Sequence, residues 1–253
     1  MRDDKKRRGV PNMKDEREIS VILPTYNEIY NIVDLIETLC MLMDKKEIKA
    51  EIVVVDDNSP DGTGRLVAER YNNNSQVKCI IRENERGLAT AIKTGILNSK
   101  GDVIVIMDTD FNHDPFKLPE MIAINDHYDI VSGSRYVWGG GMLGSRFRYW
   151  GSYFFNLFIR AILGLETRDN FSGFVVFKRQ ILDKFDMDYV FRGYGEYYIR
   201  FLWYAKKLNL KVIEVPVMYK LRQGGESKTN FLRCLFVYAL TALQLKLREV
   251  KGE

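Results

Sequence analysis

Two aspartates that directly follow an apolar run are the residues of this chain best suited to bind a metal. Asp108 and Asp110 come after Val103–Met107, a run typical of a buried strand. Side chains two residues apart in an extended segment share a face, so the two carboxylates would converge. Their repulsion is relieved by a hard cation such as Mg²⁺ or Mn²⁺, with Asn112 as a candidate third oxygen ligand. The alternative is that both aspartates merely cap a loop.

Polar residues also follow the first two apolar runs, Ile19–Leu23 and Glu51–Val55. Asp56 comes directly after the second run, where a buried carboxylate can accept a hydrogen bond from a ring N–H of a nucleotide base. After the first run, Tyr26 could stack on the base and Glu28 could bind the base or ribose. For Glu28 the alternative is that it simply opens the helix that follows.

The first 138 residues alternate short apolar runs with helix-like segments. Strands are predicted at 19–23, 51–55, 77–81, 103–107 and 129–132, and helices at 31–43, 62–71, 87–98 and 115–125. Such alternation is typical of a parallel sheet covered on both faces, which binds ligands at the carboxyl ends of its strands. No glycine-rich phosphate loop follows any of these strands, so a metal would have to offset a diphosphate charge.

The character of the chain changes after residue 138. Residues 143–165 combine many aromatic side chains with arginines, which predicts either an amphipathic helix at a membrane surface or a core helix packed on the sheet. Strands are predicted at 174–177 and 211–215, helices at 195–208 and 231–248, and a polar loop at 220–229. The apolar stretch Cys234–Leu245 is shorter than the roughly 20 residues that span a bilayer, so we expect no transmembrane helix.

Composition excludes several classes of protein. The 253 residues suit one large α/β domain, and 38 Lys and Arg against 34 Asp and Glu give a smaller basic excess than nucleic-acid binding requires. Cys40, Cys79 and Cys234 are widely spaced in apolar contexts, which favours free thiols in a reducing compartment. Met1–Glu18 mixes charges of both signs without an apolar core, which predicts a disordered tail rather than a secretory signal.

Taken together, these segments resemble family 2 glycosyltransferases with the A-type fold, and most of all the polyprenyl-phosphate glycosyltransferases such as the dolichyl-phosphate mannosyltransferases. The matching strings are Leu23–Glu28, Val55–Thr63, Gly87–Ala91, Met107–Asp110 with His113, Val131–Tyr136, Ser172–Phe174 and Gly225–Lys228. The resemblance implies a Rossmann-like, mostly parallel sheet flanked by helices, with amphipathic helices toward the C-terminus.

The resemblance also implies a role for each matching position. The nucleotide sugar would be held by Pro24, Tyr26, Glu28, Asp56, Asp108, Arg222 and Lys228; the metal, Mg²⁺ or Mn²⁺, by Asp108, Asp110 and Asn112; and the catalytic residues would be Asp110 and Arg135. Three positions depart from the family pattern, namely Thr109, Asn112 and Val175. Asn112 bears on the third metal contact and Val175 on one phosphate contact, so the departures affect the exact substrate more than the reaction class.

The implied reaction is an inverting transfer of a hexose, mannose from GDP-mannose, to a polyprenyl or dolichyl phosphate. A phosphate monoester has a second pKa of about 6 and is largely dianionic at neutral pH, so it needs no strong base. One alternative is a saccharide hydroxyl as acceptor, which would need a base such as Asp169 or Glu196. Another is a nucleotide-sugar-binding subunit of a membrane complex that does not catalyse.

We therefore expect a catalytic domain at 19–230, made of a nucleotide-sugar part (19–138) and an acceptor part (139–230). A charged tail would precede it at 1–18 and an amphipathic helix would follow it at 231–253. The protein is expected to be peripheral on the cytoplasmic face of a membrane, with or without a small membrane-anchoring subunit, and to bind no nucleic acid.

Overall fold

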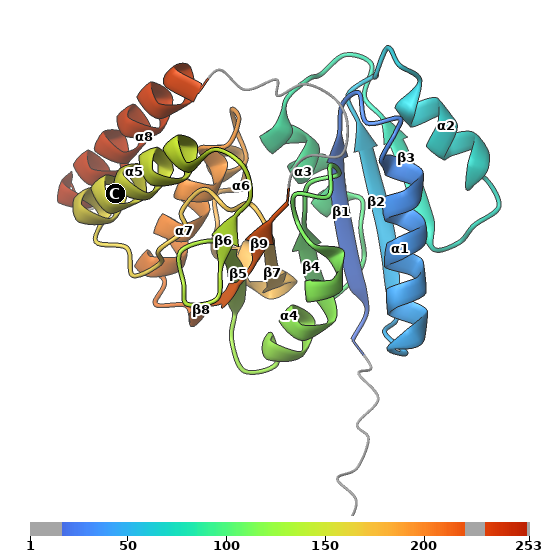
Figure 1. Ribbon diagram of the computed structural model, residues 1–253, viewed down its shortest axis with the longest axis horizontal. Helices are drawn as coiled ribbons and strands as arrows, with labels where there is room; N and C mark the ends of the chain where they lie inside the picture. The colour runs from blue at the N-terminus through green and yellow to red at the C-terminus, as the bar shows by residue number, and fades with distance from the viewer. Residues whose placement is uncertain (1–16, 221–230, 252–253) are drawn as a thin grey trace, which may run out of the picture.

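Apolar strands and amphipathic helices alternate along the chain, and in the computed structural model they form a sheet with helices on both faces (Figure 1). The structure describes residues 17–220 and 231–251. The main sheet has seven strands in the order β3-β2-β1-β4-β7-β5-β8. These strands are β1 (Ile19–Thr25), β2 (Ala50–Asp56), β3 (Val77–Ile81), β4 (Val103–Ile106), β5 (Ile130–Ser134), β7 (Val175–Lys178) and β8 (Val212–Pro216).

Most strand pairs in this sheet are parallel, as the sequence predicts. β1 pairs in parallel with β2 and β4, β2 with β3, and β5 with β8. β7 lies between β4 and β5 and runs antiparallel to both. The sequence predicts a strand at 174–177 but neither its place between β4 and β5 nor its antiparallel direction. Both depend on how the connecting segments return to the sheet rather than on local pattern.

Helices cover both faces of the sheet because its strands are apolar on both sides. The helices are α1 (Ile32–Lys45), α2 (Thr63–Arg70), α3 (Leu88–Leu97), α4 (Leu118–Ile124), α5 (Arg146–Leu163), α6 (Met187–Val190), α7 (Tyr197–Lys207) and α8 (Phe231–Lys251). In β1, Val21 and Leu23 pack in the cluster with α1, α2 and α4, whereas Ile22 packs in the cluster with α3 and α5–α8. Alternating side chains of one strand therefore serve two cores.

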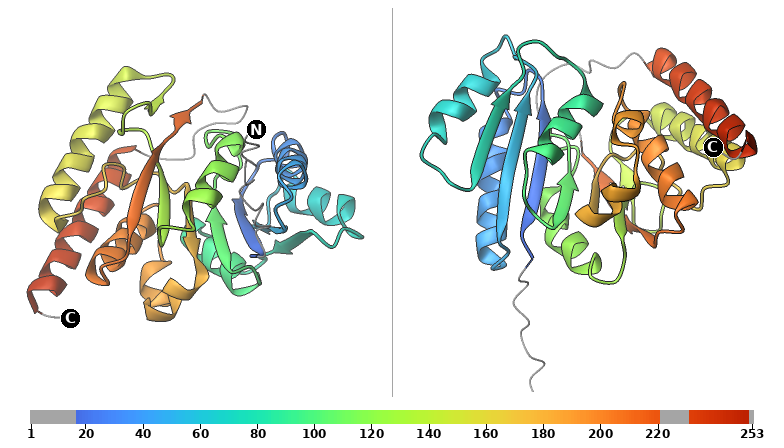
Figure 2. Two further views of the ribbon diagram at one scale, coloured as in Figure 1. Left: turned by 90° about the horizontal axis from the view of Figure 1, so that it is seen from below. Right: turned by 180° about the vertical axis from the view of Figure 1, so that it is seen from behind.

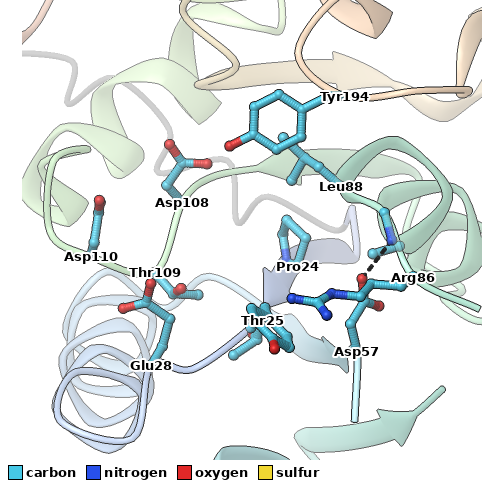
Figure 3. Close-up of a pocket in the computed structure, with 13 residues that line it drawn as sticks. Pro24, Thr25, Glu28, Asp57, Arg86, Leu88, Asp108, Thr109, Asp110 and Tyr194 are labelled. Carbon is cyan, nitrogen blue, oxygen red and sulfur yellow. Dashed lines mark hydrogen bonds between the residues drawn. The ribbon is translucent and has the colours of Figure 1, made fainter. Parts of the chain in front are cut away.

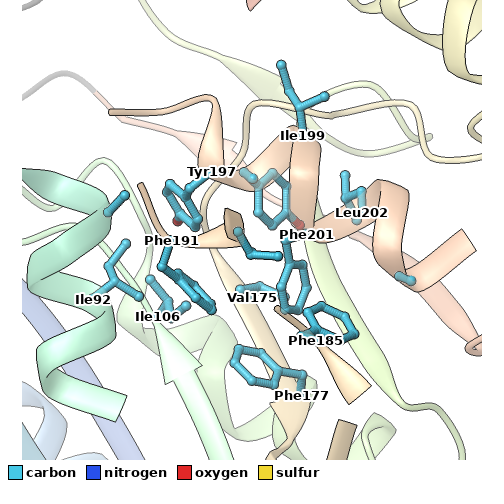
Figure 4. Packing of buried hydrophobic residues seen from close by; sticks show 14 of the residues in the cluster. Ile92, Ile106, Val175, Phe177, Phe185, Phe191, Tyr197, Ile199, Phe201 and Leu202 are labelled. Carbon is cyan, nitrogen blue, oxygen red and sulfur yellow. The ribbon is translucent and has the colours of Figure 1, made fainter. Parts of the chain in front are cut away.

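The cluster on the α3 side is rich in aromatic residues and joins the two halves of the sheet (Figure 4). Ile92 of α3 and Ile106 of β4 belong to the same cluster as Phe177 of β7 and Phe201 of α7. The rings of Phe177 and Phe201 lie 5.0 Å apart, centroid to centroid. This packing fixes α7 over the antiparallel strand.

α5 and α8 lie side by side at one end of the molecule (Figures 1 and 2). α5 begins at the cap Ser145, whose Oγ accepts a hydrogen bond from the Arg148 N–H, and ends at Gly164, which has a φ of 62°. None of the helices in 17–220 and 231–251 has both the length and the apolarity of a bilayer span.

Several short elements escaped the sequence prediction. The expected helix at 115–125 begins as a 3₁₀ turn, η1 (Pro115–Lys117), before α4 starts. A second 3₁₀ turn, η2 (Arg179–Lys184), the helix α6, and the small sheet of β6 (Gly141–Met142) and β9 (Met218–Tyr219) were not predicted. Elements of two to six residues are too short to show a period. Residues 1–16 of the predicted tail and residues 221–229 of the predicted polar loop lie outside the described residues.

Candidate active site

A cavity of about 320 Å³ opens at the carboxyl ends of β1, β2 and β4 (Figure 3). It is lined by Pro24, Thr25, Tyr26, Glu28, Asp57, Arg86, Gly87, Leu88, Ala91, Asp108, Thr109, Asp110 and Tyr194. A second cavity of about 340 Å³ adjoins it and shares Tyr26, Asp57 and Arg86. Parallel strands end at one edge of the sheet, which is why residues so far apart in the chain meet here.

Asp108 and Asp110 both line the first cavity, as the sequence predicts for a shared site. The Asp108 side chain is 49% exposed. Asp110 is buried and accepts hydrogen bonds from the Asn112 backbone N–H and from its Nδ2, each at 3.1 Å. Asn112 therefore orients Asp110, and it is not among the described residues that line the cavity.

The donor set fits a hard divalent cation. Asp108 and Asp110 line one cavity, together with the carboxylates of Glu28 and Asp57. The described residues contain no group of three or more His, Cys, Asp or Glu side chains that could hold an ion without other ligands. Mg²⁺ characteristically takes one or two carboxylates and completes its shell with water and substrate phosphates. Asp108 and Asp110 are the residues that would hold such an ion.

Asp56 has a different environment from the one expected for a base-binding residue. Its side chain is buried and accepts hydrogen bonds from the Ser59 N–H (2.8 Å) and Oγ (2.6 Å). Burial is the main cause that raises the Asp56 pKa, although the bonds from Ser59 act in the opposite direction. It lies beneath Gly64, where a Cβ would come within 2.6 Å of its Oδ2. Asp56 thus shapes the loop and does not line the cavity.

Asp57, which the sequence pattern did not indicate as a site residue, lines both cavities instead. Its Oδ1 accepts from Arg82 Nε at 2.7 Å, and its Oδ2 accepts from the Gly87 N–H at 2.7 Å. Arg82 also donates to Gly87 O and to Thr90 Oγ1, each at 2.9 Å. The pair therefore ties the end of β2 to the start of α3.

Tyr26, Glu28 and Arg86 form the wall toward β1. The Arg86 guanidinium lies 3.7 Å from the centroid of the Tyr26 ring, a cation–π geometry. Glu28 Oε2 accepts from Asn31 Nδ2 at 3.0 Å, and its backbone oxygen accepts from the Asn31 and Ile32 N–H groups. Glu28 thus opens α1 and lines the cavity as well. Pro24 also lines it, and Arg86 was not anticipated.

Tyr194 closes the cavity from the other half of the molecule. It precedes α7 and lines the cavity together with Leu88 and Asp108 (Figure 3). Its N–H donates to Glu196 Oε2 at 3.0 Å, and Glu196 is buried beneath this turn. No local pattern in the sequence marked Tyr194, because only the tertiary fold brings this turn to the ends of β1 and β4.

Arg135 lies in the core rather than at the cavity. Its Nε and Nη2 each donate to Asp169 at 2.7 Å, and its N–H donates to the same carboxylate at 3.0 Å. Burial alone would lower the pKa of the Arg135 guanidinium, but the charge and hydrogen bonds of Asp169 outweigh it and raise that pKa. Arg135, the predicted phosphate contact, thus forms a buried ion pair with Asp169 instead. Neither Asp169 nor Glu196, the two candidate bases, lines the cavity. Arg222 and Lys228 lie outside the described residues.

Comparison with known proteins identifies the family of this chain. A family model described as glycosyl transferase family 2 matches residues 20–186. The dolichol-phosphate mannosyltransferase of Pyrococcus furiosus is 34% identical over 221 residues, which are 83% of this chain and 59% of that protein. The undecaprenyl-phosphate mannosyltransferase of Micrococcus luteus is 34% identical over 217 residues, 84% of this chain and 87% of that protein.

Two further proteins extend the comparison. The polyprenol monophosphomannose synthase of Mycolicibacterium smegmatis is 32% identical over 250 residues, 92% of this chain and 89% of that protein. The glucosyl-3-phosphoglycerate synthase of Mycobacterium tuberculosis, solved with Mn²⁺ and uridine-diphosphate-glucose, has a TM-score of 0.68 at 21% identity and covers 92% of this chain and 80% of its own, which shows a shared A-type fold. The chain belongs to glycosyl transferase family 2.

Proposed function

We propose that this protein transfers a hexose, mannose from GDP-mannose, to a polyprenyl or dolichyl phosphate with the help of Mg²⁺ or Mn²⁺. The observation that carries the proposal is the convergence of Asp108 and Asp110 with Asp57, Tyr26 and Arg86 on one cavity at the strand ends. The names of the relatives support the lipid-phosphate acceptor.

In this proposal the two joined cavities hold the nucleotide. Tyr26 and Arg86 offer a flat and cationic wall to the base, and the Asp57 carboxylate would accept hydrogen bonds from ring or exocyclic N–H groups. Asp108 and Asp110 would hold the metal, which when bound offsets the charge of the leaving diphosphate. Arg222 and Lys228 are proposed as additional phosphate contacts.

The environments of the two candidate bases favour a phosphate acceptor over a hydroxyl. Asp169 is bound by Arg135, and Glu196 is buried beneath the turn that carries Tyr194. A lipid monophosphate is already largely dianionic near neutral pH, since its second pKa is about 6, and can attack C1 without a base. Direct displacement would invert the anomeric carbon.

An exposed apolar face supports access to a membrane-bound acceptor. On α5 it consists of Phe147, Trp150, Phe154, Leu157 and Phe158, and on α8 of Phe236, Leu240, Leu243, Leu247 and Val250. The spacing of three and four residues places each set on one side of its helix. Arg146 and Arg148 are exposed at the start of α5 and suit lipid phosphates. We propose that the two sets, on helices that lie side by side, form one face, and that this face rests on the cytoplasmic surface of the membrane or is covered by a small anchoring subunit.

The test is a transfer assay with labelled GDP-mannose and, separately, labelled UDP-glucose. The protein is incubated with polyprenyl phosphate and Mg²⁺ or Mn²⁺, and the products are extracted into organic solvent. We expect label from GDP-mannose in the organic phase only when metal is present. Label only in a water-soluble glycan would support the hydroxyl acceptor instead, and nucleotide binding without turnover would support a non-catalytic subunit.

A further inference from the structure

His113 is a fully buried histidine in the loop after β4, and its imidazole contacts the backbone of Asp108, which lines the cavity. We propose that His113 is a positioning residue, which holds Asp108 in place for the donor site and links it to β9 through Tyr219. The proposal rests on the proposed function, because Asp108 is there assigned to hold the metal and diphosphate.

The hydrogen bonds of the imidazole define its direction. His113 Nδ1 accepts from the Asp108 backbone N–H at 2.9 Å. An acceptor at Nδ1 means that the ring proton lies on Nε2, which is 2.9 Å from Tyr219 Oη and 3.1 Å from Ser172 O. Tyr219 Oη itself donates to Ser172 O at 2.7 Å, so it can accept from Nε2. The ring thus connects Asp108 to Ser172 and Tyr219.

Packing prevents the ring from turning out of this arrangement. His113 stacks on Phe174 with 4.9 Å between centroids and 10° between planes, and Tyr219 meets its edge at 5.0 Å. Phe174 and Tyr219 are both buried. Because the ring cannot rotate, the position of Tyr219 on one side constrains the position of the Asp108 backbone on the other.

Asp108 needs this support because the strand ladder ends just before it. Met107 N–H donates to Ile22 O of β1 at 3.4 Å, and the following N–H, that of Asp108, is bound by the imidazole. The loop then turns through Phe111, which has a φ of 59°, and returns to His113. The histidine therefore closes the short loop that carries both cavity aspartates.

The contacts of His113 with Tyr219 extend to the part of the chain expected to bind the acceptor, residues 139–230. Tyr219 is the last residue of β9, and Lys220 follows it. The Lys220 N–H donates to Asn112 O at 3.4 Å, and its Nζ lies 3.3 Å from Asp114 Oδ1. The loop 108–114, which carries both cavity aspartates, is therefore bound at three points to Tyr219 and Lys220: through His113, Asn112 and Asp114. These two residues come shortly before Arg222 in the sequence, which the proposed function assigns to phosphate binding. Tyr219 and His113 are the buried part of these contacts.

Two substitutions separate the two ends of the imidazole. Asparagine places an amide oxygen near the position of Nδ1 and keeps an acceptor for Asp108, whereas glutamine places its amide nitrogen near Nε2 and keeps a donor for Tyr219 and Ser172. In the metal-free protein, we expect His113→Gln to speed hydrogen exchange at the Asp108 amide by at least about tenfold, and His113→Asn to leave it within about threefold of wild type.

The same variants are then compared in metal binding and turnover. For His113→Gln, the Mn²⁺ concentration at half-maximal activity should rise about tenfold, with the KM for the lipid acceptor unchanged, because outer contacts of metal ligands typically change metal affinity by 10–100-fold. Tyr219→Phe keeps the ring and removes only the hydroxyl, and should raise that Mn²⁺ concentration by a smaller factor, about threefold. Binding of the nucleotide without metal should stay near wild type in all three.

Equal impairment of His113→Gln and His113→Asn would show that only the volume of the ring matters and would overturn the proposal. Wild-type exchange and wild-type Mn²⁺ dependence in His113→Gln would overturn it as well. If the wild-type protein shows no metal-dependent transfer, the proposed function fails, but the exchange measurement still tests whether His113 holds Asp108. Should the His113 variants not fold, Tyr219→Phe carries the test, and wild-type Mn²⁺ dependence in it would refute the link to β9.

Discussion

The two halves of the sheet use the same kinds of polar residue in opposite ways. In the half formed by β3-β2-β1-β4, Glu28, Asp57 and Asp108 follow strand ends and line the cavity. In the half formed by β7-β5-β8, polar side chains are bound to one another, as in the Ser132–Tyr198 hydrogen bond of 2.6 Å. The difference teaches that a charged residue next to a strand marks a ligand site only where the fold leaves it facing a cavity.

Two arginine–aspartate pairs make the contrast concrete. Arg82–Asp57 has side chains only 5% and 7% exposed, yet Asp57 still lines both cavities. Arg135–Asp169 has side chains 9% and 0% exposed and packs against the Tyr219 ring at 4.7 Å. The first pair fixes a cavity wall, and the second is part of the core that supports β5.

The largest effect should come from breaking the core pair. We expect Asp169→Asn to lower the free energy of unfolding by ~3–5 kcal/mol, because Arg135 would keep its charge without a buried partner. Denaturant unfolding measures this loss. Asp57→Asn is the matched variant and should lose less stability, since Arg82 would keep its ion pair with Glu85 at 3.2 Å and its hydrogen bonds to Gly87 and Thr90. Its nucleotide affinity should fall. Equal losses of stability in the two variants would remove the distinction between the pairs.

The next largest effect should come from Asp110, on the cavity side. Asp110→Asn should lower metal-dependent turnover by about 10²–10³-fold, the scale on which enzymes lose rate when a charge-stabilising group is removed. The melting temperature should change little, because Asn112 can still donate to the new amide oxygen. Asp126→Asn, at an exposed aspartate outside the cavity, is the control and should be as active as wild type. Near-normal turnover in Asp110→Asn would refute the metal assignment.

Sequence pattern predicted the first half better than the second for a physical reason. Strands β1, β2 and β4 are mostly apolar on both sides and are followed by polar residues, so the local sequence pattern predicts both their existence and their ends. A shift of one residue still reverses the side of the strand, and this is why Asp56 was chosen where Asp57 faces the cavity. Tyr194 and the Arg135–Asp169 pair depend on contacts between distant segments, which no local pattern reveals.

The exposed apolar face on α5 and α8 offers a third test, with a smaller effect. Phe154→Ser combined with Leu243→Ser should weaken binding to anionic lipid vesicles by roughly tenfold, which corresponds to about 1.4 kcal/mol of lost apolar burial. Co-sedimentation with vesicles measures this. Phe116→Ser replaces a phenylalanine that is also exposed, 60%, but lies on η1, outside this face. Equal vesicle binding by all three proteins, with a loss of self-association in the double variant, would assign the face to a second copy instead.

The smallest effect concerns the thiol pKa of Cys79, which lies on the edge strand β3 of the main sheet. Burial is the main cause that raises the pKa of its thiol from 9.0 to about 11, and the charge of Asp56 adds to it. Because the folded pKa exceeds the unfolded one, the stability that this thiol contributes is complete below about pH 9 and is lost as pH rises toward 11.

Alkylation of the native protein should therefore be slow at pH 8 and should accelerate with a midpoint near pH 11. Cys79→Ser identifies the signal among the three cysteines. Asp56→Asn should lower the midpoint only slightly, since burial outweighs charge as a cause. A large decrease in that variant would mean that Asp56 acts on Cys79 mainly through its charge. A midpoint near 9 in the wild-type protein would mean that water reaches the Cys79 thiol between β3 and α2, so that burial does not raise its pKa.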